Sequence, residues 1–376
     1  MTSVTHAVRD VGLMVAARLT PRATADGDTV LVAQPDHLGD ILLSQPAVRL
    51  LREQLPHVRL VGVVGPWSAE IARLAWPVDD VVAIDFPGFA RATSSDPSAP
   101  YRLLRPASET LARLRPGAAI VLRPDAWWAA WLGALVAREV VTASDTRTRR
   151  FATLDVPVSD DEHAAVRAAR IVAGWVGGAL PSPDATPVSI RPDASARGEA
   201  AALLSTAAVD RRYAVVHPGS GAAVKLWPES HWRQVIGALS ERGLAVVVTG
   251  GNGEQDLCAS ITSGTGAVNI AGRTTVAVLL EVMRGAAITA GTDNGPMHLA
   301  VAAGTPTVHV FGPSDPRRYG PWGDARRHRV VSAGWRCLRC GDLGPDRPAG
   351  CGCMLAITSE VVVAAIDDLL DAHDPG

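Results

Sequence analysis

The chain consists largely of short apolar runs, rich in β-branched residues, that alternate with stretches whose apolar residues recur at helical spacing. Residues 29–34 (TVLVAQ) predict a strand, and residues 40–55 behind them predict a helix. The alternation continues to residue 142 and returns at residue 213, with further strands expected at 213–217, 245–249, 267–270, 287–290 and 307–311. Near-continuous apolar strands are typical of parallel sheets buried on both faces. The pattern therefore predicts an α/β fold whose parallel sheets are covered by helices.

One interruption of this alternation predicts a domain boundary. Residues 144–160 break the pattern, a helix is expected over 161–176, and prolines follow at 181, 183, 187 and 192. We therefore expect two doubly wound domains, over residues 1–180 and 181–358, which also suits a chain of 376 residues. Residues 87–106 are rich in serine, proline and glycine and predict a mobile loop. Residues 1–27 precede the first expected strand and have no assigned role.

Charge and hydropathy exclude several classes of protein. A formal net charge of −2 provides no basic field for nucleic acid. No apolar stretch reaches the ~20 residues of a membrane-spanning helix, and the longest, residues 126–137, is interpreted as a helix in a protein core. The start of the chain lacks the pattern of a secretory signal. We expect a cytoplasmic protein.

The loop after the first strand carries a candidate catalytic carboxylate. Ligands of doubly wound sheets bind beyond the carboxyl ends of the strands, and residues 35–40 (PDHLGD) occupy such a position. Gly39 permits a tight turn, and Asp40 stands where a helix N-cap is expected. Asp40 either caps the helix only or also acts as a general base. Arg102, Arg105 and Arg123 are candidate contacts for an anionic ligand, or else ordinary solvated surface residues.

The loop after residue 217 (HPGSGAAVKLWP) has the composition of a phosphate-binding loop. Its small residues leave backbone N–H groups accessible, and the hydroxyl of Ser220 is close in sequence. Lys225 follows, the single lysine among 36 basic residues. The segment does not match the Walker A pattern. Lys225 is therefore either a phosphate ligand or a solvated surface cation.

Three further loops of the second block carry candidate ligand-binding residues. In residues 291–300 (GTDNGPMHLA), Pro296 suits the first turn of a helix whose amides, from Asn294 and Gly295 onward, would attract a diphosphate. Asp293 is a candidate for sugar hydroxyls, and His298 is either a ligand or a packed helix residue. In residues 250–255 (GGNGEQ), Glu254 either binds a ribose or begins a helix. Thr274 either walls a base pocket or caps the next helix.

These features divide between the two blocks in a way typical of a donor-binding and an acceptor-binding domain. Phosphate-type and ribose-type features lie in the second block, and a lone carboxylate lies in the first. The G-x-G-x-x-G fingerprint of nicotinamide enzymes is absent after the first strand. The G-x-S-x-G pattern of a serine nucleophile is also absent.

Four cysteines gather near the end of the chain, at Cys337, Cys340, Cys351 and Cys353. Thiolates at such spacing are candidate ligands of a structural Zn²⁺, although the C-x-C half is irregular for a zinc ribbon or finger. Disulfides and free thiols are the alternatives that the sequence leaves open.

Taken in order, these motifs resemble glycosyltransferase family 9, the heptosyltransferases, which build the inner core of bacterial lipopolysaccharide from ADP-heptose. The resemblance covers about residues 29–366. It is carried by the following segments: LGDILLSQPAVRLLRE, HPGSGAAVKLWPESHWRQVI, VVVTGGNGEQ and AGTDNGPMHLAVAAGTPTVHVFGPSDP. It implies a GT-B fold, in which two Rossmann-like domains with doubly wound parallel sheets face each other across a cleft. It also implies that the chemical step requires no cofactor.

The resemblance assigns a role to each candidate residue. Asp40 in the acceptor-binding first domain would be the general base of an inverting transfer. The second domain would bind the nucleotide-sugar donor through Ser220, Lys225, Glu254, Thr274, Asp293, Asn294, Gly295, Pro296 and His298. The last helix, residues 359–372, would pack back on the first domain. The implied reaction moves heptose from ADP-heptose to a hydroxyl of a lipopolysaccharide core glycolipid, a related glycan or a small natural product.

Two other functions suit the same fold. A nucleotide-sugar epimerase or hydrolase would turn over the donor without an acceptor, and a non-catalytic protein would only bind the nucleotide sugar. The sequence leaves open the acceptor, the exact donor, the oligomeric state and peripheral contact with a membrane.

Overall fold

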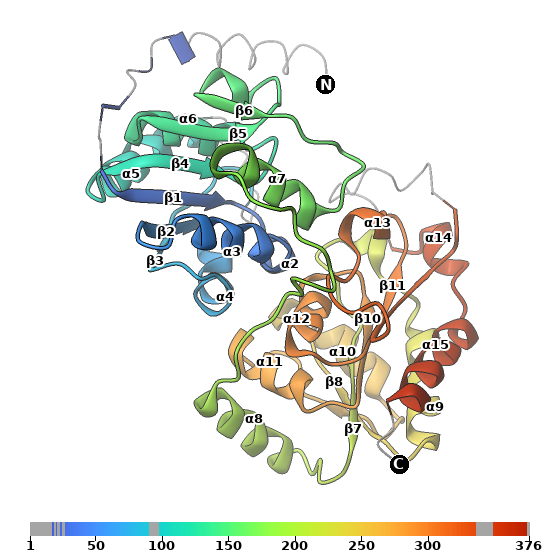
Figure 1. Ribbon diagram of the computed structural model, residues 1–376. Helices are drawn as coiled ribbons and strands as arrows, with labels where there is room; N and C mark the ends of the chain where they lie inside the picture. Colours follow the sequence, from blue (N-terminus) through green and yellow to red (C-terminus); the bar gives the residue numbers. More distant parts are fainter. Residues whose placement is uncertain are drawn as a thin grey trace. The chain divides into compact units, whose positions relative to one another are not determined.

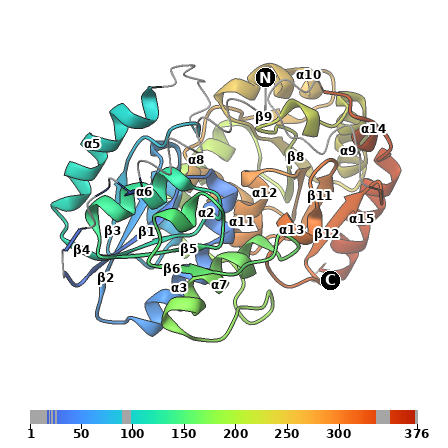
Figure 2. The same cartoon turned by 90° about the horizontal axis from the view of Figure 1, so that it is seen from above.

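The computed structural model describes residues 17–18, 20, 23–24, 27–89, 98–335 and 349–373. It divides into two compact units, Met1–Pro181 and Ser182–Gly376. Each unit contains its own six-stranded parallel sheet with helices packed along it (Figures 1 and 2). Among the described residues, no helix is long and apolar enough to cross a membrane.

The first sheet has the strand order β3-β2-β1-β4-β5-β6. The strands are β1 (Thr29–Gln34), β2 (Arg59–Val64), β3 (Asp80–Ala83), β4 (Pro116–Val121), β5 (Glu139–Ala143) and β6 (Leu154–Val156). All five pairs are parallel. This is the order of nucleotide-binding Rossmann folds, in which the chain changes direction across the sheet between β1 and β4. The predicted strand 29–34 matches β1, whereas the short edge strand β6 was not predicted.

The helices of the first unit form packed pairs along this sheet. They are α2 (Leu38–Leu43), α3 (Gln45–Gln54), α4 (Ala69–Ala75), α5 (Ala99–Ala112), α6 (Trp127–Val136) and α7 (Ala164–Val176). Helix α3 packs against α7, and α5 packs against α6. Helix α6 is buried along almost its whole length, which confirms the interpretation of residues 126–137 as a core helix.

Helix α5 corrects the prediction of a mobile loop over residues 87–106. The helix begins at Ala99, with Pro100 in its first turn, and continues through Pro106. A proline inside a helix costs a backbone hydrogen bond. Leu104, Ala107 and Leu111 nevertheless recur at helical spacing and are buried against the core. Tertiary burial of this apolar stripe therefore outweighs the local signal of the prolines.

The second sheet has the strand order β12-β11-β10-β7-β8-β9, the same Rossmann order traced from the other side. The strands are β7 (Tyr213–His217), β8 (Ala245–Val248), β9 (Val268–Asn269), β10 (Ile288–Thr292), β11 (Thr307–Phe311) and β12 (His328–Ser332). All pairs are parallel. The chain changes direction across this sheet between β7 and β10. Strand β12 was not predicted, because polar residues begin it at the sheet edge.

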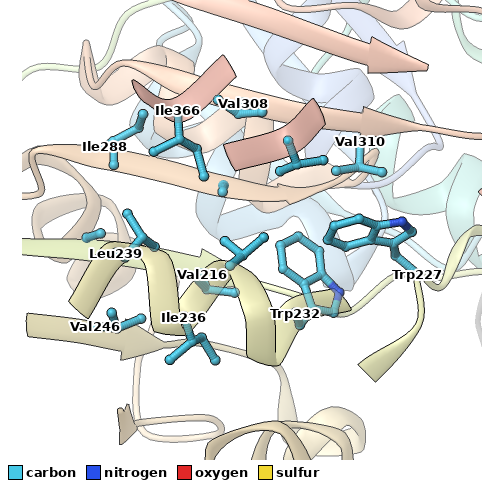
Figure 3. Close-up of a cluster of buried hydrophobic side chains, with 14 of the residues drawn as sticks. Val216, Trp227, Trp232, Ile236, Leu239, Val246, Ile288, Val308, Val310 and Ile366 are labelled. Carbon is cyan, nitrogen blue, oxygen red and sulfur yellow. The ribbon is translucent and has the colours of Figure 1, made fainter. Parts of the chain in front are cut away.

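The helices of the second unit enclose a large apolar core. They are α8 (Ala194–Thr206), α9 (Glu229–Glu241), α10 (Gln255–Thr262), α11 (Val276–Arg284), α12 (Gly295–Ala303), α13 (Pro316–Tyr319), α14 (Gly352–Leu355) and α15 (Ser359–Ala372). Trp227 and Trp232 meet edge to face in this core, with ring centroids 4.8 Å apart (Figure 3). The indole nitrogen of Trp227 donates to the carbonyl of Ile357, which ties the segment before α15 into the core.

The last helix, α15, belongs to the core of the second unit. It packs on α9 and on strands β10, β11 and β12, and Figure 2 shows it beside β11 and β12. Val362, Ile366 and Leu369 are its buried residues in that core. The apolar face of α15 is thus covered by the sheet and helix of its own unit, and the expected contact of residues 359–372 with the first domain stays a prediction.

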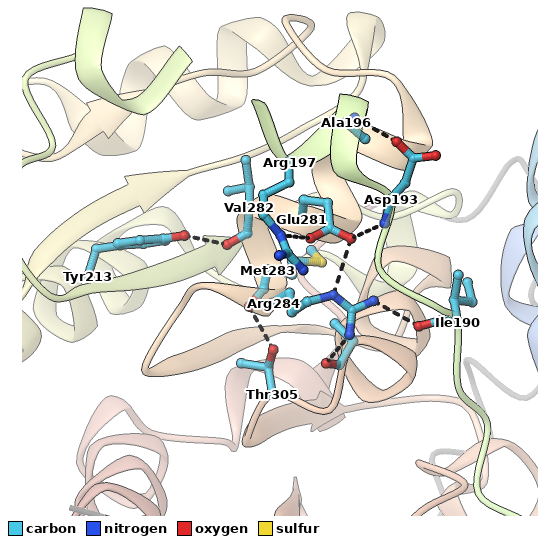
Figure 4. Close-up of polar contacts among 11 residues, drawn as sticks. Ile190, Asp193, Ala196, Arg197, Tyr213, Glu281, Val282, Met283, Arg284 and Thr305 are labelled. Atoms are coloured by element: carbon cyan, nitrogen blue, oxygen red, sulfur yellow. Dashed lines mark hydrogen bonds and ion pairs between the residues drawn. The ribbon is translucent and has the colours of Figure 1, made fainter. Parts of the chain in front are cut away.

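A buried ion pair fastens the start of the second unit to α11 (Figure 4). The Glu281 carboxylate, 2% exposed, accepts hydrogen bonds from Arg284 Nε at 3.2 Å and from the backbone N–H of Asp193 at 3.2 Å. Arg284 also donates to the carbonyls of Ile190 and Ala303, each at 2.9 Å. These bonds lie near the residues that begin β10 and β11, and so at the amino-terminal edge of the sheet.

Candidate functional site

Each unit gathers charged side chains where its strand order reverses. In the first unit these residues follow β1 and β4, and in the second they follow β7, β10 and β11. Loops at such points are where doubly wound sheets bind ligands.

In the first unit, Asp40 lies in the first turn of α2. The N-cap residue is His37, whose side chain makes no capping hydrogen bond, and Asp40 is the third residue of the helix. The expectation that Asp40 occupies the N-cap position was therefore wrong by three residues. Its carboxylate is half-buried, and at this end of the helix its negative charge is favoured by the helix dipole.

A second carboxylate, Asp36, lies four residues before Asp40 and is 6% exposed. It forms an ion pair with Arg123, which follows β4 and also binds Asp125 at 2.5 Å. Burial raises the pKa of Asp36 to about 7, and the negative charge of Asp40 adds to this effect. Arg123 acts in the opposite direction. Arg123 is thus held by two carboxylates, which excludes its reading as an ordinary solvated surface residue. Arg105, in contrast, is exposed and pairs with Glu109 along α5.

A pocket opens at the same edge of the first sheet. Its lining comes from four segments: residue 35 after β1, residues 86, 87 and 89 after β3, residues 125–129 after β4, which include the start of α6, and residue 147 after β5. We call it the aromatic pocket, because Phe86, Phe89, Trp127 and Trp128 are among its walls. The guanidinium of Arg123 lies over the ring of Phe89, 5.0 Å from its centroid.

In the second unit, Lys225 is fixed by an ion pair. Its Nζ lies 2.7 Å from Oδ2 of Asp293, and the two side chains are 18% and 7% exposed. The hydroxyl of Ser314, which follows β11, donates to the same carboxylate oxygen. Lys225 is therefore not the solvated surface cation that the sequence left as an alternative.

The loops after β7 and β10 are joined through one carbonyl group. The carbonyl of Gly219 accepts hydrogen bonds from Oγ1 of Thr292 and from Nδ2 of Asn294, both at 2.6 Å. The side chain of Asn294 also caps α12 by accepting from the backbone N–H of Met297 at 3.0 Å. Gly295 begins the helix and Pro296 lies in its first turn, as predicted for a helix start at this point. The structure thus places the amino end of α12 beside Asp293.

Glu254 is held against the same loop. Its Oε2 accepts from the backbone N–H of Gly251 at 2.7 Å and lies 3.7 Å from Nε2 of His217. A Cβ atom at Gly219 would lie 2.0 Å from the Glu254 carboxylate, so a larger residue there would displace that carboxylate. Burial lowers the pKa of His217, and the charge of Glu254 opposes that effect. His217 is fully buried and also pairs with Thr249 at 2.9 Å.

The remaining candidates of the second unit occupy different settings. Ser220 is half-buried, and its Oγ accepts from the backbone N–H of Ala222 at 3.4 Å. His298 is buried in α12, with its ring 6.1 Å from that of His309. The cap of α11 is Thr275, which accepts from Val278, so the alternative of Thr274 as the cap was wrong.

The cysteine cluster is only partly described. Cys337 and Cys340 lie outside the described residues, whereas Cys351 and Cys353 have their Sγ atoms 3.3 Å apart. Within the described parts of the chain, no group of three or more His, Cys, Asp or Glu side chains could hold a metal ion. A site built from all four cysteines stays a prediction.

Sequence reasoning missed three residues of these clusters: Asp36, Ser314 and the ring of His217. All three stand within three residues of the end of a strand at the edge that carries the candidate sites. Position relative to the strand ends would have found them, because the loops that follow parallel strands meet at one edge.

Comparison with known proteins identifies relatives over most of the chain. Residues 112–342 match the family model described as glycosyltransferase family 9 (heptosyltransferase). Lipopolysaccharide heptosyltransferase 1 of Escherichia coli K12 is 24% identical over 301 residues, which cover 78% of this chain and 91% of that protein. The structure of E. coli ADP-heptose lipopolysaccharide heptosyltransferase II matches with a TM-score of 0.75 and 17% identity, covering 92% of this chain and 99% of that one.

A second solved structure is the E. coli heptosyltransferase WaaC with ADP-2-deoxy-2-fluoro heptose. It matches with a TM-score of 0.67 and 21% identity, covering 90% of this chain and 99% of that chain. These likenesses, with the two Rossmann-type sheets, confirm the predicted GT-B fold class.

Proposed function

The chain belongs to glycosyltransferase family 9, and from this membership we propose that it transfers a sugar, with inversion, from a nucleotide-sugar donor to an acceptor hydroxyl. ADP-heptose is the donor that we favour, because one solved relative is named with an ADP-heptose analogue. The acceptor is a hydroxyl of a lipopolysaccharide core, a related glycan or a small molecule. We place the reaction in the cytoplasm.

The observation that carries the proposal is the Lys225–Asp293 ion pair at the amino end of α12. An ammonium group, the hydroxyl of Ser314 and the amino end of a helix lie together there, and the positive end of a helix dipole favours an anion such as a diphosphate. As the bond from the anomeric carbon to the donor phosphate breaks, negative charge gathers on the departing diphosphate. Lys225 and the dipole of this helix would stabilise that charge. Glu254, held by Gly251, would accept hydrogen bonds from the ribose.

The first unit would supply the base and bind the acceptor. The acceptor oxygen attacks the anomeric carbon and forms the new bond while its proton passes to the carboxylate of Asp40. A positioned base contributes ~10²–10⁴-fold to the rate. The proposed division of labour is therefore an acceptor-binding first domain and a donor-binding second domain, with Ser220, Asn294 and the start of α12 around the donor.

Two measurements on the full-length protein test this function. A thermal-shift panel of nucleoside diphosphates should show preferential stabilisation by ADP, since a ligand that binds only the native state raises the melting temperature. Incubation with ADP-heptose should release ADP in the presence of an acceptor, and NMR of the product should show the inverted anomer. Equal release of ADP without an acceptor would indicate a hydrolase, and conversion of the donor sugar without release would indicate an epimerase. Stabilisation without any turnover would indicate a binding protein.

A further inference from the structure

We propose that the aromatic pocket of the first unit binds an uncharged aryl ring of the acceptor. The inference rests on the proposed function and deepens it by naming the chemical class of the acceptor. The acceptor would be an aryl-bearing molecule that presents a hydroxyl to Asp40, without a phosphate group next to its ring.

The position of the pocket connects it with the proposed base. Each of its four lining segments follows a parallel strand of the first sheet, so the pocket lies at the carboxyl-terminal edge. Pro35, in its lining, belongs to the loop between β1 and α2, and Asp40 lies in the first turn of α2. A molecule in the pocket therefore contacts the loop that leads into the helix carrying the base.

The walls of the pocket suit a flat apolar group. The ring of Phe86 meets the ring of Trp128 edge to face, with centroids 5.6 Å apart. It also meets the ring of Phe89 edge to face, with centroids 6.4 Å apart. The indole nitrogen of Trp128 donates to the carbonyl of Pro100 at 2.7 Å, so its polar atom is already satisfied. Trp127 is half-buried and offers a further ring. Aromatic side chains in such arrangements favour offset or edge-to-face contact with another aromatic ring.

The lining offers few partners for the hydroxyl groups of a sugar. Eight of its ten residues have apolar side chains, and only Asp125 and Arg147 are polar. A hydroxyl placed against apolar walls loses its hydrogen bonds to water without replacement, which is costly. The pocket has a cavity volume of about 130 Å³. An engineered apolar cavity of ~150 Å³ binds benzene, so the pocket has room for about one aryl ring.

The charges around the pocket oppose a phosphate group. Two arginines, Arg123 and Arg147, face three carboxylates, those of Asp36, Asp40 and Asp125. Although burial acts the other way, the hydrogen bond and the charge of Arg123 lower the pKa of Asp125, and Arg147 adds to that effect. The cations are therefore matched by carboxylates, and no surplus positive charge remains for a dianion.

The experiment measures binding of three probes to the full-length protein by calorimetry: phenyl β-D-glucoside, its 6-phosphate and methyl β-D-glucoside. We expect phenyl glucoside to bind at least ~10-fold more tightly than either of the others, a difference of ~1.4 kcal/mol. Trp127→Ala should weaken phenyl glucoside binding by a similar factor, whereas Trp127→Phe should retain it. Trp335→Ala removes an exposed tryptophan of the second unit and serves as the matched control.

Several outcomes would overturn the proposal. These are absence of phenyl glucoside binding, equal binding of methyl glucoside, tighter binding of the 6-phosphate, or unchanged binding in a folded Trp127→Ala variant. ADP binding, measured in parallel, separates this proposal from the proposed function. Binding of ADP without binding of phenyl glucoside removes the aryl site and leaves the transferase. Binding of phenyl glucoside through Trp127 without binding of ADP supports the aryl site and removes the transferase.

Discussion

The two units have the same strand order but opposite chemistry where that order reverses. The first unit places the carboxylates of Asp36 and Asp125 against Arg123, with the charge of Asp40 acting on Asp36, and the second places Lys225 against Asp293 at the amino end of α12. The first cluster has an excess of negative charge, as a proton acceptor requires. The second has a cation at the positive end of a helix dipole, where an anion is favoured. The strand order thus determines where a ligand site forms, and the loops determine what it binds.

Two ion pairs of the second unit lie at opposite edges of its sheet. Lys225–Asp293 lies at the carboxyl-terminal edge of the sheet, whereas Glu281–Arg284 lies at the amino-terminal edge. The partners of Glu281 and Arg284 include three backbone groups, which fasten chain segments together. Burial and charge alone therefore do not identify a functional site. The edge of the sheet at which an ion pair lies distinguishes a pair at a ligand site from a pair that only holds chain segments together.

The largest expected effect tests the role of the first unit. Asp40→Asn should lower kcat by ~10²–10⁴-fold, because an amide cannot accept the acceptor's proton. ADP affinity should stay unchanged, since the donor residues lie in the second unit. Steady-state kinetics and calorimetry with ADP measure the two quantities. A fall in kcat of less than ~10-fold would show that Asp40 is not the base.

The next largest effect concerns the amino-terminal edge of the second sheet. Glu281→Ala should lower the free energy of unfolding by ~3 kcal/mol, because it leaves the largely buried charge of Arg284 without its partner. Urea denaturation measures this change. ADP affinity of the folded variant, measured at low temperature, should match that of the wild type. A loss of ADP affinity in folded protein would contradict the separation of the two edges.

A smaller effect is expected for Lys225→Ala. ADP should bind ~10- to 100-fold more weakly, which corresponds to one lost hydrogen bond between charged groups. The control is Arg211→Ala, which removes the same charge from an exposed residue two positions before β7, at the other edge of the sheet. Calorimetry with ADP compares the variants. Equal affinities in the two variants would remove Lys225 from diphosphate binding.

The sequence was sufficient to predict the architecture, because periodicity is a local property of the chain. The strands 29–34, 213–217 and 307–311 and the helix 359–372 were predicted with the bounds that the structure shows. Elements that depend on tertiary burial were missed, as α5 illustrates with its internal proline. The place of α15 in the core of the second unit was not predicted, because the expectation for residues 359–372 rested on the family resemblance and not on their apolar pattern.

The candidate site was predictable only as a set of loops. Lys225 was singled out by its type, but its fixation by Asp293 and Ser314 joins residues far apart in the chain. The same holds for Asp36 and Arg123, which follow different strands and meet only once the sheet forms. Pairings of this kind follow from the register of the strands, which the sequence pattern did not specify.

The smallest expected effect is an opposite response of the two units to pH. In the second unit, His328 is buried and pairs with Thr307 at 2.8 Å, and burial lowers its pKa to about 4. The unfolded chain therefore binds more protons than the native unit between about pH 4 and 6.5, so the stability of this unit falls as the pH falls through that range. In the first unit, burial raises the pKa of Asp36 to about 7. The native unit then binds more protons than the unfolded chain, and its stability falls as the pH rises from about 4 to 7.

Melting curves between pH 4.5 and 8 test this opposition through two variants. Asp36→Asn removes the ionisable group at this position, so the stability of this variant relative to the wild type should rise as the pH increases across this range. His328→Gln should show the reverse, with a relative gain at the acidic end. The same pH dependence in both variants would contradict the contrast between the units. It would mean that the surroundings of Asp36 and His328 do not change the pH dependence of stability in opposite directions.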